Sequence, residues 1–437
     1  MDTIYGLSTI LGRSGVAVVR ISGPKSLDLF KAFIGREIEP RKATFATLKA
    51  PFTGEILDKI ITIYFKGPNS FTGEDIVEFH LHGSIAVIKD LLNELSNIPY
   101  VRCAQPGEFT RQAFQNGKMN LIEVEALADL IHSETTAQRR TAIHQISGHL
   151  TALYNSWKQS IIEIMAQFEA YIDFPDDDIP HEAINRGLQI INLLSEQIRD
   201  HLIISERATA MVNGISIAIG GPPNVGKSSI MNLLAKQEIA IVSDIAGTTR
   251  DILQVKMEIS GVGVTIYDTA GIRENASDEV EKEGIRRAKS AMESADIKIY
   301  VFDICNIEEM RNFSIEDDAV VILNKSDLLS DVGDVAKNFI AFSVKNSHNL
   351  DRLLSKIQSI VEDKCSLASD AIVTTHQRQK EKLLDVLFYL RSIDLMEPLE
   401  MTAEKVRSAV ASIEYITGKI TLDDILDKIF SSFCIGK

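Results

Sequence analysis

The sequence predicts a multidomain protein with an α+β domain at the N-terminus, an all-α helical domain, and an α/β domain inserted into the helical domain. Short β-rich runs, separated by glycine and proline, fill residues 1–117. Apolar residues at helical spacing dominate residues 118–210 and return in residues 370–437. Strand-like and helix-like segments alternate in residues 211–369, which is typical of a doubly wound α/β fold. Helices on both sides of this block imply that it is an insertion.

The composition indicates an ordinary water-soluble protein. The chain has 437 residues, enough for two or three domains, and no stretch approaches the length of a membrane span. Its hydrophobic share is 45% and its charged share is 24%. The first residues lack the basic start of a secretory signal, and the four cysteines form no C-x-x-C pair. We therefore expect a reducing, cytoplasmic location and no structural zinc site.

The net charge of the chain limits how it could bind nucleic acid. The net charge is −15, which argues against a surface that coats nucleic acid broadly. Any contact with RNA must therefore be local or supplied by a partner.

In the N-terminal domain, alternating apolar and polar residues predict three strands, over residues 15–24, 59–65 and 75–83. Helical spacing predicts helices over residues 26–33 and 85–95. The mixture gives the α+β class for this domain.

The helical domain is predicted from apolar residues that recur every three or four positions. Its first part contains three such series: Leu121, Val124, Leu127 and Ile131; Leu153, Trp157, Ile161, Ile164, Phe168 and Tyr171; and Ile184, Leu188, Ile191, Leu194 and Ile198. Its second part contains three more: Leu383, Val386, Leu387 and Leu390; Val406, Val410, Ile413 and Ile416; and Leu422, Ile425, Leu426 and Ile429. The acidic run Asp173–Asp178 could suggest a metal loop, but a solvated connection between helices is the favoured interpretation.

The segment Gly221–Ser228 fits the phosphate-binding loop pattern G-x-x-x-x-G-K-[ST]. It follows the apolar run 215–219, expected to be a buried strand, and precedes a helix that is expected to start near Ser229. Glycines let the backbone curl around phosphate oxygens, Lys227 can reach the β- and γ-phosphates, and the hydroxyl of Ser228 can bind Mg²⁺. The alternative, a turn that caps a helix, requires that nothing downstream complete a nucleotide site.

Two downstream motifs do complete such a site. The first is Asp268-Thr269-Ala270-Gly271, in which Asp268 can order Mg²⁺ through water and the Gly271 N–H can reach a γ-phosphate. The second is Asn324-Lys325-Ser326-Asp327, whose carboxylate can accept hydrogen bonds from N1–H and N2–H₂ of guanine and so reject the wrong base by about 10⁴ or more. In this order, each after a predicted strand, the motifs resemble the G domain of translation-factor-class GTPases.

Three further segments extend the resemblance to the whole chain. They are Phe71-Thr72-Gly73-Glu74-Asp75, Asp244-Ile245-Ala246-Gly247-Thr248-Thr249-Arg250-Asp251, and the terminal Cys434-Ile435-Gly436-Lys437. Together they resemble the MnmE (TrmE) family of tRNA uridine-modification GTPases. The tetrapeptide is the most specific, because neither packing nor capping requires it.

The family resemblance implies a function in tRNA modification. The N-terminal domain would bind 5-formyltetrahydrofolate or a related tetrahydrofolate and form a homodimer. With an MnmG-like FAD protein, in a heterotetramer, the chain would add an aminomethyl or carboxymethylaminomethyl group to C5 of the wobble uridine in certain tRNAs. The folate would supply one carbon, and GTP hydrolysis would drive a required conformational cycle.

By matching position, the resemblance assigns folate contacts to Arg20, Glu78, Lys118 and the terminal Lys437. A carboxylate can accept hydrogen bonds from a pterin edge, and Arg or Lys can pair with the carboxylates of a glutamate tail. From the residues alone, a surface charge is the alternative for each. Cys434 would lie near the folate, and a redox or nucleophilic role for its thiol is a hypothesis.

The nucleotide and ion contacts in the α/β domain are assigned in the same way. Mg²⁺ would bind Ser228 and Thr249, and K⁺ would bind Asn224, Ser243, Ile245 and Thr248. GTP would contact Asn224, Val225, Gly226, Lys227, Ser228, Ser229, Ser243, Asp244, Ile245, Ala246, Gly247, Thr248, Thr249, Asp268, Thr269, Ala270, Gly271, Asn324, Lys325, Asp327, Ser343, Val344 and Lys345. Val344 stands where the family pattern has alanine, a change that leaves the backbone contact to guanine O6 in place.

The residue that orients the attacking water is also unusual. Ile272 stands where Ras-like proteins have a glutamine, and its side chain can neither donate nor accept a hydrogen bond. The resemblance gives this role to Glu281, with K⁺ at the phosphates where an arginine finger would otherwise contribute about 10³–10⁵ in rate. Arg250, a finger candidate by charge, is interpreted as structural.

Two functions from different classes stay open at this point. One is a GTP-hydrolysing subunit of a tRNA-modifying enzyme, and the other is a GTP-driven switch that binds RNA or ribosomal particles without modifying them. The N-terminal domain and the terminal tetrapeptide favour the first, because a switch has no need of a folate pocket.

Overall fold

The computed structural model describes residues 2–173, 181–236, 254–268, 292–329, 339–365, 371–394, 396–419, 423–431, 433 and 436. The chain divides into two compact units. The first comprises Met1–Ile131, Gln145–Ile191 and Leu384–Lys437, and the second comprises His132–His144 and Asn192–Leu383. Along the chain, the α/β block lies between helical segments of the first unit, which confirms the predicted insertion. The boundaries predicted near residues 117, 210 and 369 stay predictions.

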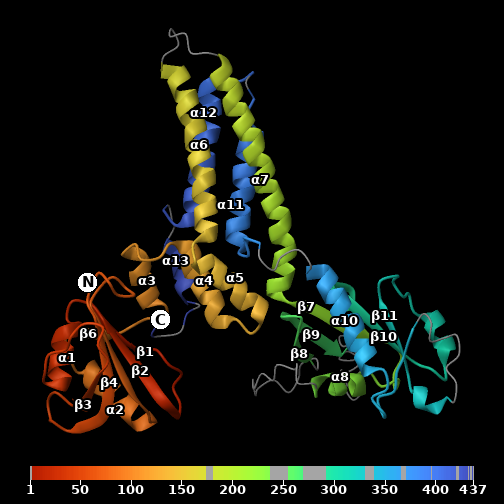
Figure 1. Cartoon of the computed structure of the whole chain (residues 1–437), viewed down its shortest axis with the longest axis horizontal. Helices are drawn as coiled ribbons and strands as arrows, with labels where there is room; N and C mark the ends of the chain where they lie inside the picture. Colours follow the sequence, from red (N-terminus) through yellow and green to blue (C-terminus); the bar gives the residue numbers. More distant parts are fainter. Residues whose placement is uncertain are drawn as a thin grey trace, which may run out of the picture. The chain divides into compact units, whose positions relative to one another are not determined.

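The first unit contains a six-stranded mixed sheet (Figure 1). Its strands are β1 (Thr3–Leu7), β2 (Ser14–Ser22), β3 (Thr44–Lys49), β4 (Ile56–Phe65), β5 (Ile76–Gly83) and β6 (Val101–Cys103), in the order β3-β4-β5-β2-β1-β6. Every neighbouring pair is antiparallel except β1 and β6, which run parallel. The three predicted strands are confirmed as β2, β4 and β5.

Helices α1 (Ser26–Ile34) and α2 (Ile85–Ser96), both predicted, cover one face of this sheet. Side chains alternate along each strand, so one set faces these helices and the other set lies on the opposite face. The core between helices and sheet includes Phe30, Phe33, Ile88, Leu91, Val19, Ile21, Val77 and Phe79. The alternation places Arg20 and Glu78 on the opposite face, outside this core.

The first unit also holds long helices that carry the predicted apolar series. Helix α6 (His149–Asp173) packs along α12 (Leu399–Thr417) (Figure 1). Lys158 Nζ pairs with Glu414 Oε1 at 3.0 Å across this contact. The buried residues on the two helices include Trp157, Ile161, Ile164, Phe168, Val406, Ile413 and Ile416. The acidic connection predicted at Asp173–Asp178 lies almost wholly outside the described residues.

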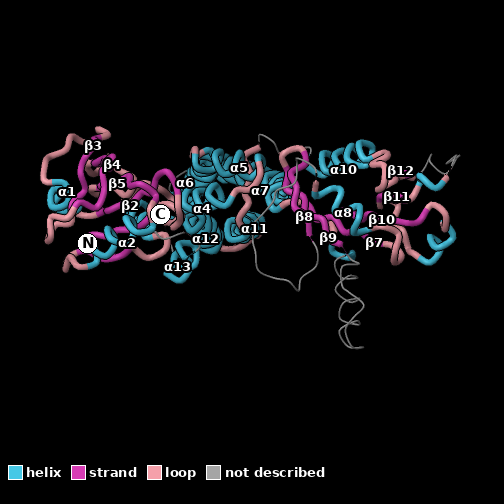
Figure 2. The backbone as a smooth tube through the Cα atoms, turned by 90° about the horizontal axis from the view of Figure 1, so that it is seen from below, coloured by secondary structure: helices cyan, strands magenta, loops and turns pink. Residues whose placement is uncertain are grey.

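The second unit is built on another six-stranded sheet, in the order β12-β11-β10-β7-β9-β8 (Figure 2). Its strands are β7 (Ile215–Gly220), β8 (Gln254–Ile259), β9 (Val262–Asp268), β10 (Ile297–Asp303), β11 (Val320–Asn324) and β12 (Ile340–Ala341). All pairs are parallel except the β8–β9 hairpin. The carboxyl ends of β7, β9, β10 and β11 therefore meet at one edge, where doubly wound sheets bind ligands.

Helices α8 (Lys227–Ala235) and α10 (Leu350–Cys365) pack on this sheet through Ile230, Leu234 and Ile357, which are buried in one apolar core with the strands. Helix α5 (Thr136–Ile146) joins the hairpin, because the Ala137 N–H donates to Gly261 O at 3.0 Å. These contacts explain why residues 132–144 belong to the second unit.

The chain enters the second unit through α7 (His181–Asn213) and leaves it through α11 (Gln377–Arg391). A buried polar contact joins the two segments: His201 Nε2 lies 2.7 Å from Thr374 Oγ1. The backbone N–H of Thr374 donates to Ser205 Oγ at 2.9 Å. The entry and exit of the insertion are thus tied to each other.

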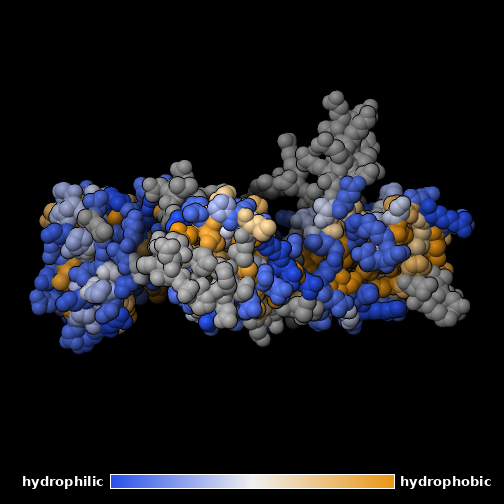
Figure 3. All heavy atoms as spheres, turned by 90° about the horizontal axis from the view of Figure 1, so that it is seen from above, coloured by the Kyte–Doolittle hydropathy of each residue, from blue (hydrophilic) through white to orange (hydrophobic). Residues whose placement is uncertain are grey.

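The surface of the part built on β1–β6 is mostly hydrophilic on the face shown in Figure 3. Across the part of the chain that is described, no helix combines the length and apolar character needed to cross a membrane.

Candidate functional site

The phosphate-binding loop connects β7 to α8, as the sequence predicts. Helix α8 begins at Lys227, directly after Gly226, and Ser229 lies in its first turn. Gly221 and Gly226 have φ angles of 131° and 100°, which residues with a Cβ rarely adopt. A Cβ on Gly221 would lie 2.1 Å from Val301 O, so the loop passes too close to β10 for any other residue.

Lys227, Ser228 and Asp268 meet at the start of α8. Asp268 is buried at the end of β9, beside Ile219 at the end of β7, and accepts a hydrogen bond of 2.5 Å from Ser228 Oγ. Lys227 Nζ donates to Gly221 O at 2.8 Å and to Pro222 O at 2.6 Å. Burial lowers the pKa of Lys227, and the nearby charge of Asp268 partly offsets the effect.

This cluster has the composition of a magnesium site. Mg²⁺ prefers hard oxygen ligands in an octahedron and is usually held by one or two protein groups together with phosphate and water. The hydroxyl of Ser228 and the carboxylate of Asp268 provide such oxygens next to the phosphate-binding loop. The residues therefore fit Mg²⁺ bound together with a nucleotide.

The two motifs predicted to read the base lie at the ends of β11 and β12, where hydrogen bonds join them to each other and to the phosphate loop. Asn324 is 4% exposed, and its Nδ2 donates to Val225 O at 2.8 Å. Its Oδ1 accepts from the Val344 N–H at 3.3 Å. Ser343 Oγ donates to Asp327 Oδ1 at 2.7 Å, which orients the carboxylate expected to read guanine. The structure thus brings Asn324, Asp327, Ser343 and Val344 together.

Sequence reasoning missed Asp303, the last residue of β10. Lys325 has a φ angle of 67°, and its Nζ donates to Asp303 Oδ2 at 2.7 Å. Burial would raise the pKa of Asp303, but hydrogen bonds from Lys325 and the Cys305 N–H outweigh it and lower the pKa. The sequence feature that could have identified Asp303 is its position, because it is the last residue of a parallel strand, as Asp268 is.

Several predicted residues lie outside the described residues. In the α/β domain these are Ser243, Asp244, Ile245, Ala246, Gly247, Thr248, Thr249, Thr269, Ala270, Gly271 and Glu281, together with Arg250 and Ile272; near the C-terminus they are Cys434 and Lys437. Their assignments stay predictions. Lys345, which is described, lies in the turn that follows Ser343.

In the first unit, Arg20 on β2 and Glu78 on β5 are direct cross-strand neighbours. Arg20 Nε donates to Glu78 Oε1 at 3.0 Å, and Arg20 Nη2 forms an ion pair with the same oxygen at 2.9 Å, while His80 Nε2 lies 3.3 Å from Oε2. Burial would raise the pKa of Glu78, but His80 and Arg20 together lower it. The ring of Phe71 lies 5.4 Å from Arg20 Cζ, in cation–π range.

Gly436, from the C-terminal tetrapeptide, lies against the strand next to Arg20. Gly6 on β1 pairs with Arg20, and a Cβ on Gly6 would lie 3.0 Å from Gly436 Cα. Ser8 Oγ donates to Gly436 O at 2.9 Å. Gly436, the member of the tetrapeptide that the structure describes, therefore lies beside the strand residue that pairs with Arg20.

Lys118 lies against the Phe71–Asp75 loop. A Cβ on Gly73 would come within 3.3 Å of Lys118 Cε, so this aliphatic chain packs on the loop. The loop runs from the ring beside Arg20 to the stem of Lys118, and it links these two predicted folate residues.

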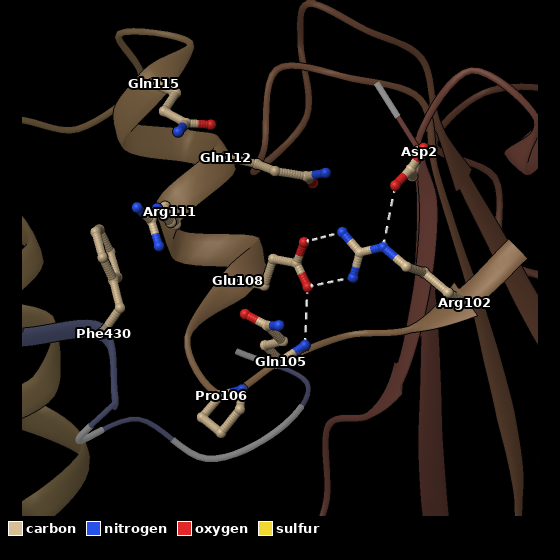
Figure 4. Close-up of a pocket in the computed structure, with 9 residues that line it drawn as sticks. All are labelled: Asp2, Arg102, Gln105, Pro106, Glu108, Arg111, Gln112, Gln115 and Phe430. Carbon is tan, nitrogen blue, oxygen red and sulfur yellow. Dashed lines mark hydrogen bonds and ion pairs between the residues drawn. The ribbon is translucent and has the colours of Figure 1, made fainter. Parts of the chain in front are cut away.

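A polar cavity of about 300 Å³ lies along α3 (Glu108–Gln115) (Figure 4). Figure 4 shows the guanidinium of Arg102 between Glu108 and Asp2, with Arg102 Nη1 2.9 Å from Glu108 Oε2. On the other side, Arg111 lies over the Phe430 ring, whose centroid is 5.8 Å from Arg111 Cζ. Because Arg102 pairs with Glu108, and Arg111 pairs with Asp427 at 2.8 Å, we interpret the cavity as the junction that holds α13 (Asp423–Ser431) to α3.

Comparison with known proteins shows the family of the chain. The family model described as "MnmE helical domain" matches residues 121–434 of the chain. The family model described as "GTP-binding protein TrmE N-terminus" matches residues 3–118. The chain belongs to the MnmE family. The first match spans the whole α/β block, in agreement with an insertion into the helical domain of MnmE.

Full-length relatives give the same result. Proteins named "tRNA modification GTPase MnmE" from Rickettsia rickettsii (strain Sheila Smith) and Rickettsia akari (strain Hartford) are 41% and 42% identical to this chain over 446 aligned residues. Each alignment covers 100% of both proteins. The resemblance to the MnmE family found in the sequence is therefore confirmed along the whole chain.

Proposed function

We propose that this chain is a GTPase that acts in tRNA modification. The observation that carries the proposal is the 2.8 Å hydrogen bond from Asn324 Nδ2 to Val225 O, which joins the base-reading motif to the phosphate loop. One guanine nucleotide can then contact both motifs. Family membership supports the same activity, because the relatives are named tRNA modification GTPases.

For hydrolysis, we propose that Lys227 pairs with the β- and γ-phosphates and that Ser228 and Thr249 hold Mg²⁺, with Asp268 acting through water. When bound, Mg²⁺ supplies positive charge to the phosphate oxygens. The contact between Ser228 and Asp268 supports this arrangement. We assign the orientation of the attacking water to Glu281.

We propose a potassium site formed by Asn224, Ser243, Ile245 and Thr248. Asn224 is the described member, and its φ angle of 61° is a conformation that asparagine adopts more readily than most residues. When bound, K⁺ supplies charge at the phosphates, in place of an arginine finger.

We propose that the first unit binds 5-formyltetrahydrofolate, or a related tetrahydrofolate, through Arg20, Glu78, Lys118 and Lys437, with Cys434 nearby. The proposal is supported by the Arg20–Glu78 contact and by the approach of Gly436 to Gly6. When bound, the folate supplies a one-carbon unit. With an MnmG-like FAD protein, the product would be wobble uridine with an aminomethyl or carboxymethylaminomethyl group at C5.

We also propose that the chain is a cytoplasmic homodimer that pairs through the sheet of the first unit. Phe45 on the edge strand β3 lies opposite Ile61 on β4, and these side chains are 67% and 48% exposed. An apolar pair of this kind gains stability when a second copy covers it.

The experiment combines a cellular and a purified-protein measurement. Wobble uridines from cells that lack the protein should lose the modified nucleoside, and wild-type protein but not the Lys227→Ala variant should restore it. The purified protein should hydrolyse GTP and bind 5-formyltetrahydrofolate. GTP hydrolysis with unchanged wobble uridines and no folate binding would instead favour the GTP-driven switch.

A further inference from the structure

The Phe71–Asp75 loop carries a carboxylate whose hydrogen-bonding capacity is unused. Both oxygens of Glu74 are buried, and neither has a hydrogen-bond partner among the described residues. Leaving such a group without a donor costs several kcal/mol for a charge and about 1–3 kcal/mol for a neutral polar group. A group this unfavourable calls for a donor that the described residues do not supply.

The surroundings of Glu74 account for the lack of a partner. The backbone of Glu74 is engaged: its N–H donates to Thr72 Oγ1 at 3.2 Å, and Ser70 Oγ donates to its carbonyl oxygen. The neighbouring amide of Asn116 donates to Thr72 O at 2.7 Å. Burial raises the pKa of Glu74, and Asn116 offsets this only in part.

Glu74 differs from Glu78, the carboxylate that the family resemblance assigns to the folate. Glu78 already accepts a hydrogen bond from Arg20, pairs with the Arg20 charge and contacts His80, so much of its acceptor capacity is used. Glu74 makes no hydrogen bond of normal geometry with the described residues, although the side-chain amide of Asn116 lies near enough to affect its pKa. A pterin ring presents adjacent N–H donors, and a carboxylate with two available oxygens can accept from both.

The loop brings Glu74 to the candidate folate site. Phe71 lies on Arg20, Gly73 lies on Lys118, and Glu74 follows Gly73 directly. We propose that Glu74 is a further ligand-binding residue of this site and accepts hydrogen bonds from the N–H groups of a pterin ring. This inference rests on the proposed folate function.

The test is calorimetric titration of 5-formyltetrahydrofolate into the full-length protein and its Glu74→Gln variant, which keeps the shape and removes an acceptor. We expect at least tenfold weaker binding by the variant, with a melting temperature no lower than that of the wild type because the buried charge is removed. Glu94→Gln is the matched control, because Glu94 Oε2 is also buried without a described partner but lies on α2, which covers the other face of the sheet. The control should bind like the wild type.

The outcomes separate the two proposals. If the wild type does not bind the folate, the proposed folate function is wrong, and this inference falls with it. If the wild type binds and Glu74→Gln binds within twofold of it, only the role of Glu74 is wrong. If Glu74→Gln does not fold, Glu74→Asp is measured, and three- to tenfold weaker binding is expected because the shorter side chain withdraws both oxygens. Wild-type affinity in that variant contradicts the inference.

Discussion

His201 allows a quantitative test of how the inserted unit holds its entry and exit segments together. The ring is 8% exposed in α7, and its Nε2 contacts Thr374 Oγ1 in the exit segment at 2.7 Å. Burial lowers the pKa of His201 from 6.5 to about 4, because a charged imidazolium loses its hydration there. The perturbation is a decrease in pH, compared between the wild type and His201→Gln, which can still hydrogen-bond but does not titrate.

The sign follows from the depressed pKa. The unfolded chain takes up a proton near pH 6.5 and the folded chain only near pH 4, so protonation favours unfolding. The neutral, buried His201 contributes fully to the free energy of unfolding above pH 6.5. This contribution decreases as the pH falls from 6.5 towards 4, and below pH 4 no more of it is lost. One pH unit corresponds to about 1.4 kcal/mol, so the full loss is about 3 kcal/mol and the loss at pH 5 is about 2 kcal/mol.

Scanning calorimetry of the full chain at pH 7 and pH 5 measures this effect. For a unit of this size, about 2 kcal/mol corresponds to a decrease of roughly 4–8 °C in the transition of the second unit. Other titrating groups act in both proteins, so the difference between wild type and His201→Gln isolates the histidine. If the two proteins lose the same stability from pH 7 to pH 5, the assignment to His201 is refuted.

Four further predictions concern the nucleotide site. Gly226→Ala should weaken GTP binding at least tenfold, because a Cβ would lie 2.4 Å from Asn324 Nδ2. The left-handed φ at this position would cost alanine about 1–2 kcal/mol in addition. A titration with fluorescent GTP measures the affinity, and an unchanged value would contradict the loop geometry. Asp327→Asn should weaken GTP binding and favour xanthosine nucleotides, and a retained preference for GTP would show that this carboxylate does not read the base. Hydrolysis should be faster in K⁺ than in Na⁺, whereas equal rates would remove the potassium assignment at Asn224. Glu281→Ala should keep GTP affinity and lose about 10²–10⁴ in turnover, and loss of both would indicate a folding defect or a wrong position.

The nucleotide motifs were predictable because each is local. A glycine-rich loop between a strand and a helix is recognisable from neighbouring residues, and Gly226 needs its φ of 100° whatever surrounds it. The order of the motifs along alternating strands then predicts a common sheet edge, and the parallel pairing of β7 with β9 and β10 confirms it. The partner of Lys325 was not predictable, because Asp303 is brought to it by the pairing of β10 with β11.

The sequence by itself determined the fold class, the inserted α/β block and the phosphate-binding loop, since these depend on periodicity and on contiguous residues. Only the tertiary structure decided which distant residues meet. Arg20 lies beside Glu78 because β2 pairs with β5, and Gly436 lies beside Gly6 although the two glycines are far apart in the sequence. Strand order and register bring together residues that no local pattern relates, and burial then decides which carboxylate is already paired and which, as at Glu74, still lacks a donor.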